Sequence, residues 1–216
     1  MEASLKAVLL DMDGVVADSM GYHVAAWQEA FGHYGLSVPA EVLYLNEGAI
    51  ATETVRRLNG GTIDAAKAEA IFALQKRIFE ERYLARVGLF ADTARFLEAV
   101  CAAGLEAALV SGSSEPLVMG ILRAEVRCYF SAVVCGDSCS RSKPHPDPYL
   151  MALSALGLTS AECIAVENSP AGVAAALSAG LTCYGLTTTL APEHLLGAVG
   201  VFGSLEELRR HLGLPE

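Results

Sequence analysis

Short apolar runs recur along the chain, and most are separated by segments in which apolar residues return every three or four positions. Short apolar runs are typical of buried strands, and the longer spacing is typical of helices with one buried face. Strands are predicted over residues 6–10, 106–110, 132–135, 163–166 and 182–186. Helices are predicted over residues 91–102, 115–124, 146–156 and 169–179. This alternation indicates an α/β fold, with a parallel sheet, helices on both faces and a ligand site at the carboxyl ends of the strands.

The stretch from about residue 19 to residue 88 interrupts this alternation. It has helical periodicity almost throughout, as in residues 65–84, and no convincing strand. It leaves the sheet directly after an acidic loop and returns near Val87-Gly88, so we expect it to cover the site as a cap. The predicted division is a Rossmann-like core of residues 1–17 and 89–216 and a helical cap of residues 18–88.

The net charge of the chain and the length of its apolar runs argue against two classes of partner, nucleic acid and membrane. Lys and Arg total 15 and Asp and Glu total 25, a net charge of −10, with no basic run that could follow a phosphate backbone. Nucleic acid is therefore not an expected partner. No apolar run approaches the roughly 20 residues of a membrane helix, so no membrane span is expected. The first residues lack the pattern of a secretory signal, which predicts a cytoplasmic location.

Two acidic residues follow the first predicted strand. Asp11 and Asp13 lie two positions apart, and Gly14 permits a sharp turn directly after them. In a loop that leaves a strand, both carboxylates can face one pocket and divide the roles of nucleophile and general acid/base. On the pair alone, a turn with solvated acids is an equally good interpretation.

Three further polar segments follow later strands. Ser111-Gly112-Ser113 offers hydroxyls and backbone amides for phosphate oxygens, and Lys143 is a cation on a proline-containing loop. Glu167-Asn168 offers oxygen ligands for a hard cation such as Mg²⁺. Taken singly, a turn, a surface lysine and a helix cap explain these segments better. Four such features at successive strand ends favour a phosphoryl-transfer site.

These segments resemble the four motifs of the haloacid dehalogenase superfamily, in its beta-phosphoglucomutase-like branch. Asp11-Met12-Asp13-Gly14-Val15-Val16-Ala17-Asp18-Ser19 resembles the first motif. Ser111 matches the second motif, Lys143 the third, and residues 166–173 (Val-Glu-Asn-Ser-Pro-Ala-Gly-Val) the fourth. The resemblance extends over nearly the whole chain. It is specific for the superfamily and much less specific for the substrate.

The resemblance implies a mechanism. Asp11 attacks phosphorus to give an aspartyl phosphate, and Asp13 protonates the leaving oxygen and then activates water. Ser111 and Lys143 hold the phosphoryl oxygens, with Gly112 and Ser113 as further substrate contacts. The implied Mg²⁺ ligands are Asp11, the backbone carbonyl of Asp13, Glu167 and Asn168.

Two positions depart from the family pattern. Asn168 stands where the family usually has an acid, so the site has one negative charge fewer and we expect weaker Mg²⁺ binding. The mutase of this branch grips the second phosphate of its substrate with a cap arginine after a glycine, whereas the comparable stretch here, from Gly48 to Thr52, contains no arginine. This favours a phosphatase over a mutase.

The resemblance also suggests contacts from the cap. It implies that His23 contacts Asp13 or the leaving group, and it makes His23 and Gly48 candidate substrate contacts, although a histidine packed near Trp27 is an equal interpretation for His23. Trp27 and the Phe72/Phe79 pair are expected in the cap core. Asp147 is expected to cap a helix. The cap cations are expected on solvated helix faces, from which one of them could reach the substrate on cap closure: Arg56, Arg57, Lys76 and Arg77.

The predicted reaction is therefore hydrolysis of a small organic phosphate monoester, such as a sugar phosphate, with Mg²⁺ as cofactor. A sugar-phosphate mutase is the alternative within the same chemistry. A catalytically silent binding protein on the same fold is the alternative outside it, since a fold does not by itself determine a function. The expected partner is a small phosphorylated metabolite, and the expected assembly is a monomer or a weak homodimer.

Overall fold

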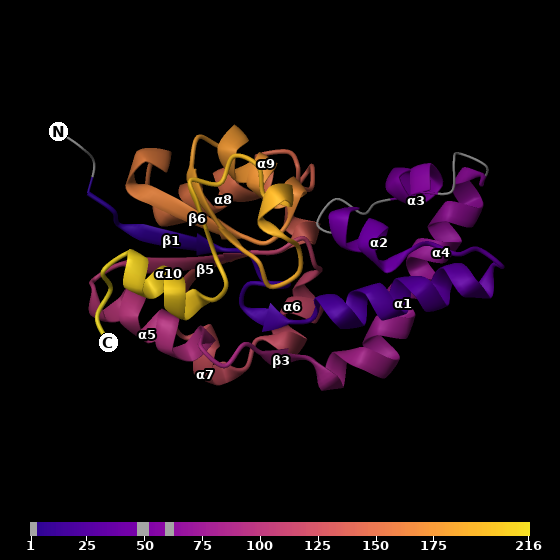
Figure 1. Cartoon of the computed structure of the whole chain (residues 1–216), viewed down its shortest axis with the longest axis horizontal. Helices are drawn as coiled ribbons and strands as arrows, with labels where there is room; N and C mark the ends of the chain where they lie inside the picture. Colours follow the sequence, from indigo (N-terminus) through magenta and orange to yellow (C-terminus); the bar gives the residue numbers. More distant parts are fainter. Residues whose placement is uncertain (1–3, 47–51, 59–62) are drawn as a thin grey trace.

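The computed structural model describes residues 4–46, 52–58 and 63–216. A six-stranded sheet forms the centre of the larger of two parts of the molecule (Figure 1). The strand order is β5-β4-β1-β6-β7-β8, and all neighbouring strands are parallel. The strands are β1 (Ala7–Leu10), β4 (Glu106–Val110), β5 (Phe130–Val134), β6 (Cys163–Glu167), β7 (Thr182–Leu186) and β8 (Gly200–Phe202). The predicted α/β fold with a parallel sheet is confirmed.

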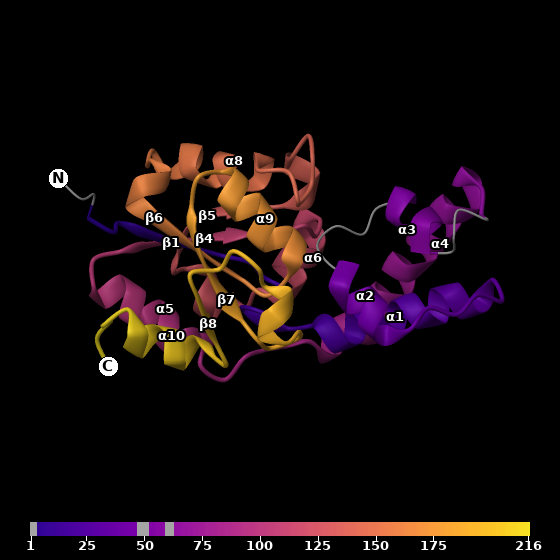
Figure 2. The ribbon, with the colours of Figure 1, turned by 45° about the horizontal axis from the view of Figure 1, so that its top comes forward.

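Helices cover both faces of this sheet (Figure 2). One face carries α8 (Asp147–Leu156) and α9 (Pro170–Ser178), and the other carries α5 (Thr93–Ala102) and α10 (Leu205–His211). Residues of β1 alternate between the two layers, because Ala7 and Leu9 belong to one buried cluster and Val8 and Leu10 to the other. A strand covered on both faces must be apolar at every position, which explains the unbroken run in the sequence.

The order of the strands determines where a ligand can bind. Along the chain, the six strands run outward from β1 through β4 to β5, and then resume on the other side of β1 with β6. In such sheets the crevice lies where the direction of winding reverses, at the carboxyl ends of the strands. Here that point is between β1 and β6, which are followed directly by Asp11 and Asn168.

Two details of the core differ from the sequence-based expectation. The edge strand β8 was not predicted, because it has only three residues and one is glycine. The helix expected over residues 115–124 ends at Ile121 as α6 (Glu115–Ile121), and a short α7 (Ala124–Arg127) follows. Leu122 and Arg123 between them have extended backbone, which interrupts the helix.

A helical unit lies to one side of the sheet (Figure 1). It contains α1 (Met20–His33), α2 (Ala40–Asn46), α3 (Thr52–Leu58) and α4 (Ala65–Ile78). The helix expected over residues 65–84 is α4 followed by a π-helix (Phe79–Tyr83) and a 3₁₀ turn (Leu84–Arg86). None of the helices in the described ranges has the length and apolar character needed to span a membrane.

Two short strands join the helical unit to the core. β2 (Ala17–Asp18) and β3 (Gly88–Leu89) pair antiparallel, so the chain leaves and re-enters the core at neighbouring points. The expected boundaries of the cap, at residues 17/18 and 88/89, fall inside these two strands. The division into core and cap at these points stays a prediction.

Candidate active site

Lys143 lies at the centre of the site, with only 3% of its surface exposed. Its Nζ donates to Asp11 Oδ1 at 2.5 Å, to Glu167 Oε1 at 2.6 Å and to the carbonyl oxygen of Val110 at 3.0 Å. An ammonium group has three hydrogens, so each of them has an acceptor. Although burial lowers it, the carboxylates of Asp11 and Glu167 hold the pKa of Lys143 above its ordinary value. The side chain is therefore a fixed positive charge next to Asp11.

Glu167, the last residue of β6, holds the Lys143 ammonium in place through an ion pair. It is fully buried, and its Oε1 also accepts from the Tyr149 hydroxyl at 2.8 Å. Its Oε2 accepts from the backbone N–H of Asn168 at 3.1 Å and from Ser169 Oγ at 3.3 Å. Both oxygens are thus occupied, which differs from the expectation that Glu167 ligates Mg²⁺ directly. A metal-ligand role for Glu167 stays a prediction, and these contacts favour an indirect role through Lys143.

Gly172, in the first turn of α9, makes room for this carboxylate. A Cβ atom at Gly172 would lie 1.9 Å from Glu167 Cδ and about as close to both of its oxygens. Ser169 caps the same helix by accepting from the Gly172 N–H at 3.0 Å. The fourth sequence motif therefore brings together a buried acid, the cap of a helix and the glycine that lets that helix approach.

Asp11 and Asp13 have opposite electrostatic environments. Burial raises the pKa of Asp11 to about 8; Lys143 acts against this, while the negative charges of Glu167 and Asp13 add to it. Burial also acts to raise the pKa of Asp13, but His23 and the hydroxyls of Ser19 and Ser113 bring it below its ordinary value. An ionised Asp11 is therefore costly unless a further cation joins the site.

Asp13 is held by three side chains. Ser19 Oγ donates to Asp13 Oδ1 at 2.5 Å, His23 Nε2 lies 3.2 Å from the same oxygen, and Ser113 Oγ donates to Oδ2 at 3.3 Å. His23 also stacks on Phe79, with ring centroids 3.9 Å apart. His23 is therefore both packed in the cap and in contact with Asp13. Its contact with the substrate stays a prediction.

The loop after β4 brings two of its three predicted site residues, Gly112 and Ser113, to the cavity. Ser111 is fully buried, and its Oγ accepts from the backbone N–H of Ser113 at 3.0 Å. Gly112, Ser113 and Ser114 line the cavity, whereas Ser111 lies behind them. The phosphate-binding role of Ser111 stays a prediction.

Asn168 lies against the turn that follows β1. It is almost fully buried, and its Nδ2 donates to Thr189 Oγ1 at 3.0 Å. Gly14 has φ of +89°, and a Cβ there would lie 2.0 Å from Asn168 Nδ2. Glycine at position 14 is therefore required both by the backbone conformation and by the approach of Asn168.

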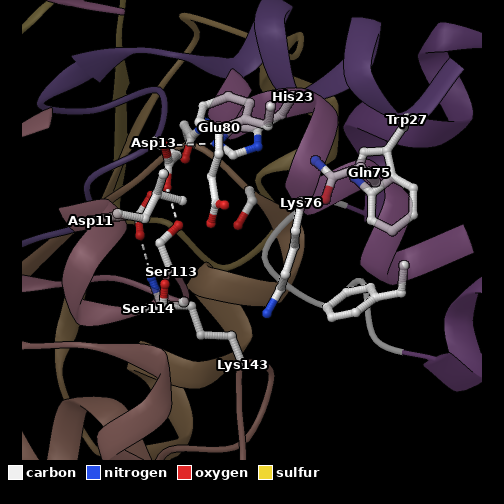
Figure 3. Close-up of a pocket in the computed structure, with 16 residues that line it drawn as sticks. Asp11, Asp13, His23, Trp27, Gln75, Lys76, Glu80, Ser113, Ser114 and Lys143 are labelled. Carbon is white, nitrogen blue, oxygen red and sulfur yellow. Dashed lines mark hydrogen bonds and ion pairs between the residues drawn. The ribbon is translucent and has the colours of Figure 1, made fainter. Parts of the chain in front are cut away.

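A cavity of about 140 Å³ lies between the core and the helical unit. Its core side includes Asp11, Asp13, Lys143 and Asn168, which the sequence analysis had placed at one site. Figure 3 shows Asp11, Asp13, Lys143 and Ser113 on one side of the cavity and Trp27 and Gln75 on the other. The cap residues that line it are His23, Trp27, Phe72, Gln75, Lys76, Phe79 and Glu80.

Part of this cap wall was not predicted from the sequence. Gln75 and Glu80 were not singled out. Lys76 is exposed, as expected, and it also lines the cavity, as one of the four cations of which one could reach the substrate. A polar residue at a helical spacing otherwise occupied by apolar residues was the available signal for Gln75. Gly48 lies outside the described residues. Asp147 does not cap its helix and instead binds Arg141 through both carboxylate oxygens, at 2.8 and 3.0 Å.

Oxygen atoms suited to a hard cation remain at the mouth of β1. Asp11 Oδ2, the carbonyl of Asp13 and Asn168 Oδ1 accept no hydrogen bond from the described part of the chain. Two carboxylates, those of Asp11 and Glu167, contact one ammonium, so the site has room for further positive charge. Mg²⁺ characteristically takes one or two carboxylates and completes its shell with water and substrate phosphate. These residues therefore fit Mg²⁺.

Comparison with known proteins agrees with this arrangement. Residues 5–180 match the haloacid dehalogenase-like hydrolase family. Phosphoglycolate phosphatase of Salmonella typhi is 29% identical and aligns with 98% of this chain and 94% of its own length. Hexitol phosphatase A of Escherichia coli (strain K12) is 29% identical, with 94% and 93% aligned. A solved structure from Bacteroides vulgatus, provisionally assigned as a beta-phosphoglucomutase, has a TM-score of 0.86 at 28% identity and covers 98% of this chain and 89% of its own.

An α/β core whose cavity is lined by two aspartates and a buried lysine is the arrangement expected of a hydrolase that acts on phosphate esters. The chain belongs to the haloacid dehalogenase-like hydrolase family. The resemblance found in the sequence is thus confirmed, and so is the enzyme class.

Gly172→Ala tests the support of Lys143. Because the added methyl group has no space beside the Glu167 carboxylate, we expect the free energy of unfolding to fall by about 1–3 kcal/mol, as in an overpacked core. Gly32→Ala in α1 is the control, since a Cβ at Gly32 has no atom within 4 Å and alanine favours a helix. Urea denaturation measures both variants. Equal stability of Gly172→Ala and wild type would contradict the close contact.

Proposed function

We propose that this chain is a Mg²⁺-dependent phosphatase that hydrolyses a small organic phosphate monoester, such as a sugar phosphate, through an aspartyl phosphate on Asp11. The observation that carries the proposal is the buried Lys143, held 2.5 Å from Asp11 at the end of a cavity closed by cap residues. Relatives named as phosphatases of phosphoglycolate, hexitol phosphates and fructose 1-phosphate support the reaction type.

Asp11 is the nucleophile of this proposal. Asp11 lines the cavity. One of its oxygens is bound by Lys143, and the other accepts no hydrogen bond within the described ranges. Lys143 restrains the carboxylate and brings positive charge to the place where phosphoryl oxygens gather. Gly112 and Ser113 line the same wall. The Gly112 N–H can donate to a remaining phosphate oxygen, and the Ser113 hydroxyl can do so by exchanging its hydrogen bond to Asp13.

Asp13 serves as the general acid and then as the general base. Ser19, His23 and Ser113 hold its carboxyl group at the cavity wall, between the core and the cap. A phosphate group bound nearby raises the pKa of Asp13, because negative charge disfavours its ionised form. The proton that Asp13 gives to the leaving oxygen is recovered from the water that cleaves the aspartyl phosphate.

The metal would be held by Asp11 Oδ2, the backbone carbonyl of Asp13 and Asn168 Oδ1, with Glu167 contributing charge from behind Lys143. When bound, Mg²⁺ supplies positive charge that reduces the repulsion between Asp11 and the substrate phosphate. Thr189 holds the amide nitrogen of Asn168, which leaves its oxygen for this purpose. Only one of these three ligands carries a full charge.

One observation favours the mutase alternative. Lys76 lines the cavity from the cap, so a cation is present on the side where a second phosphate would lie. Glu80 lines the cavity one helical turn later and offsets that charge. The charges of Lys76 and Glu80 cancel, and the stretch from Gly48 to Thr52 contains no arginine. Both observations support the phosphatase as the main proposal.

Asp11→Asn tests the covalent role. An amide does not attack phosphorus, so we expect turnover of p-nitrophenyl phosphate to fall about a thousandfold or more. Asp18→Asn, at an exposed aspartate of β2, is the control and should keep wild-type activity. Acid quenching of wild type followed by peptide mass spectrometry should place the phosphoryl group on Asp11. Near-normal turnover by folded Asp11→Asn would refute the mechanism.

Asn168→Asp tests the metal site. A carboxylate in place of a neutral amide adds a negative charge next to the cation, so we expect Mg²⁺ to bind about tenfold more tightly. Calorimetric titration of the protein with Mg²⁺, without substrate, measures the affinity. An unchanged affinity would place residue 168 outside the metal shell.

The fate of the phosphoryl group separates phosphatase from mutase. The enzyme is incubated with beta-glucose 1-phosphate, Mg²⁺ and a trace of the 1,6-bisphosphate, and glucose 6-phosphate and free phosphate are followed together. We expect free phosphate to form faster than glucose 6-phosphate. The opposite charges of Lys76 and Glu80 cancel, so the cap does not retain a bisphosphate. Faster formation of glucose 6-phosphate would establish the mutase instead.

A further inference from the structure

Gln75 occupies a position where the helix pattern calls for an apolar residue. The buried residues of α4 are Ala68, Ile71, Gln75 and Ile78, at spacings of three, four and three. Gln75 is 5% exposed, although glutamine is seldom buried to this degree. The helix therefore carries one amide on its otherwise apolar face.

This amide has no hydrogen-bond partner in the described part of the chain, and it lines the cavity. An amide has two donor hydrogens and a carbonyl oxygen, and leaving them without partners in a buried place is unfavourable. Trp27 and Phe72 line the same cavity. The Phe72 ring has no N–H or O–H donor, and the Trp27 indole N–H makes no hydrogen bond to Gln75 in the described part of the chain. Buried polar groups without partners call for an explanation.

The position of Gln75 indicates which part of a substrate it could meet. Figure 3 shows Gln75 beside Trp27, on the side of the cavity away from Asp11 and Lys143. A phosphate bound at Asp11 therefore directs its alcohol portion toward Gln75. Aromatic rings suit the C–H faces of a carbon chain, and an amide suits its hydroxyl groups.

The charges at this end of the cavity argue against an anionic alcohol portion. Lys76 and Glu80 both line the cavity from the same helical segment as Gln75, so their formal charges cancel. A carboxylate or second phosphate would gain attraction from Lys76 and repulsion from Glu80. Hydroxyl groups can bind either side chain without such a conflict.

We propose that Gln75 is a specificity-determining residue that hydrogen-bonds a hydroxyl group on a neutral, polyhydroxylated leaving alcohol. This inference rests on the proposed phosphatase function and specifies its substrate class. A site that offers a buried hydrogen-bonding group discriminates strongly against an analogue that lacks the matching hydroxyl, because the group then stays without a partner. Phosphoglycolate, whose alcohol portion is a short carboxylate, fits this cavity less well.

The test compares Gln75→Leu with Gln28→Leu, which alters the other glutamine of the chain, an exposed residue of α1. Phosphate release is measured with glucitol 6-phosphate, fructose 1-phosphate, phosphoglycolate, hexyl phosphate and p-nitrophenyl phosphate. We expect wild type to prefer one of the two hydroxylated esters. For that ester, Gln75→Leu should lower kcat/KM about 10–100-fold. With hexyl phosphate and p-nitrophenyl phosphate, the kcat/KM of Gln75→Leu should stay within about twofold of wild type. The kcat/KM of Gln28→Leu should do so with every ester.

The melting temperature of Gln75→Leu separates a structural role from a role in specificity. Leucine removes an amide without partners, so the Tm of Gln75→Leu should equal or exceed that of wild type. A lower Tm with equal loss on every ester would show a structural role and overturn the proposal. So would unchanged kcat/KM on both hydroxylated esters, or a wild-type preference for phosphoglycolate.

A binding measurement separates this proposal from the proposed function. Calorimetry with Asp11→Asn compares the affinities for glucitol 6-phosphate, fructose 1-phosphate and hexyl phosphate, with and without Gln75→Leu. If wild type hydrolyses none of the esters, the phosphatase proposal fails. The Gln75 proposal then stands if a hydroxylated ester binds more tightly and loses about 10–100-fold in affinity in Gln75→Leu, and it falls if no such loss occurs.

Discussion

A single buried ammonium group holds the site together. Lys143 bridges Asp11 at the end of β1 and Glu167 at the end of β6, and it also binds the last carbonyl of β4. Burying charges is costly unless they are paired and hydrogen-bonded, and removing one partner of such a set leaves an uncompensated charge. The loop of Lys143 is thus tied to three neighbouring strands of the sheet.

Much of the surrounding core can be understood as support for this arrangement. Tyr149 on α8 and Ser169 at the start of α9 complete the hydrogen bonds of Glu167, and Gly172 lets α9 approach it. The orientation of Asp11 is therefore set by residues from both the sheet and the helices. In the proposed mechanism, a nucleophile held in this way needs little reorganisation when a phosphate arrives.

The core side and the cap side of the cavity differ in the chemistry of their side chains. The core side of the cavity presents charge and hydrogen-bond donors that suit any phosphate group, whereas the cap side presents aromatic rings, one amide and a balanced pair of charges. The relatives with different named substrates are consistent with a shared core chemistry and a variable alcohol portion. His23 belongs to both parts, because it lies on the first cap helix and contacts Asp13.

The sequence by itself determined the α/β fold and the polar strand ends that converge on one site. Apolar runs and strand-end acids are local patterns, and parallel strands bring their carboxyl ends together, so Asp11, Asp13, Lys143 and Asn168 could be placed at one site. Tertiary structure alone decided which way each side chain faces. Glu167 points under the site to Lys143, Ser111 lies behind Ser113, and Gln75 faces the cavity across from Asp11. These directions depend on contacts between residues far apart in the chain, which no local pattern records.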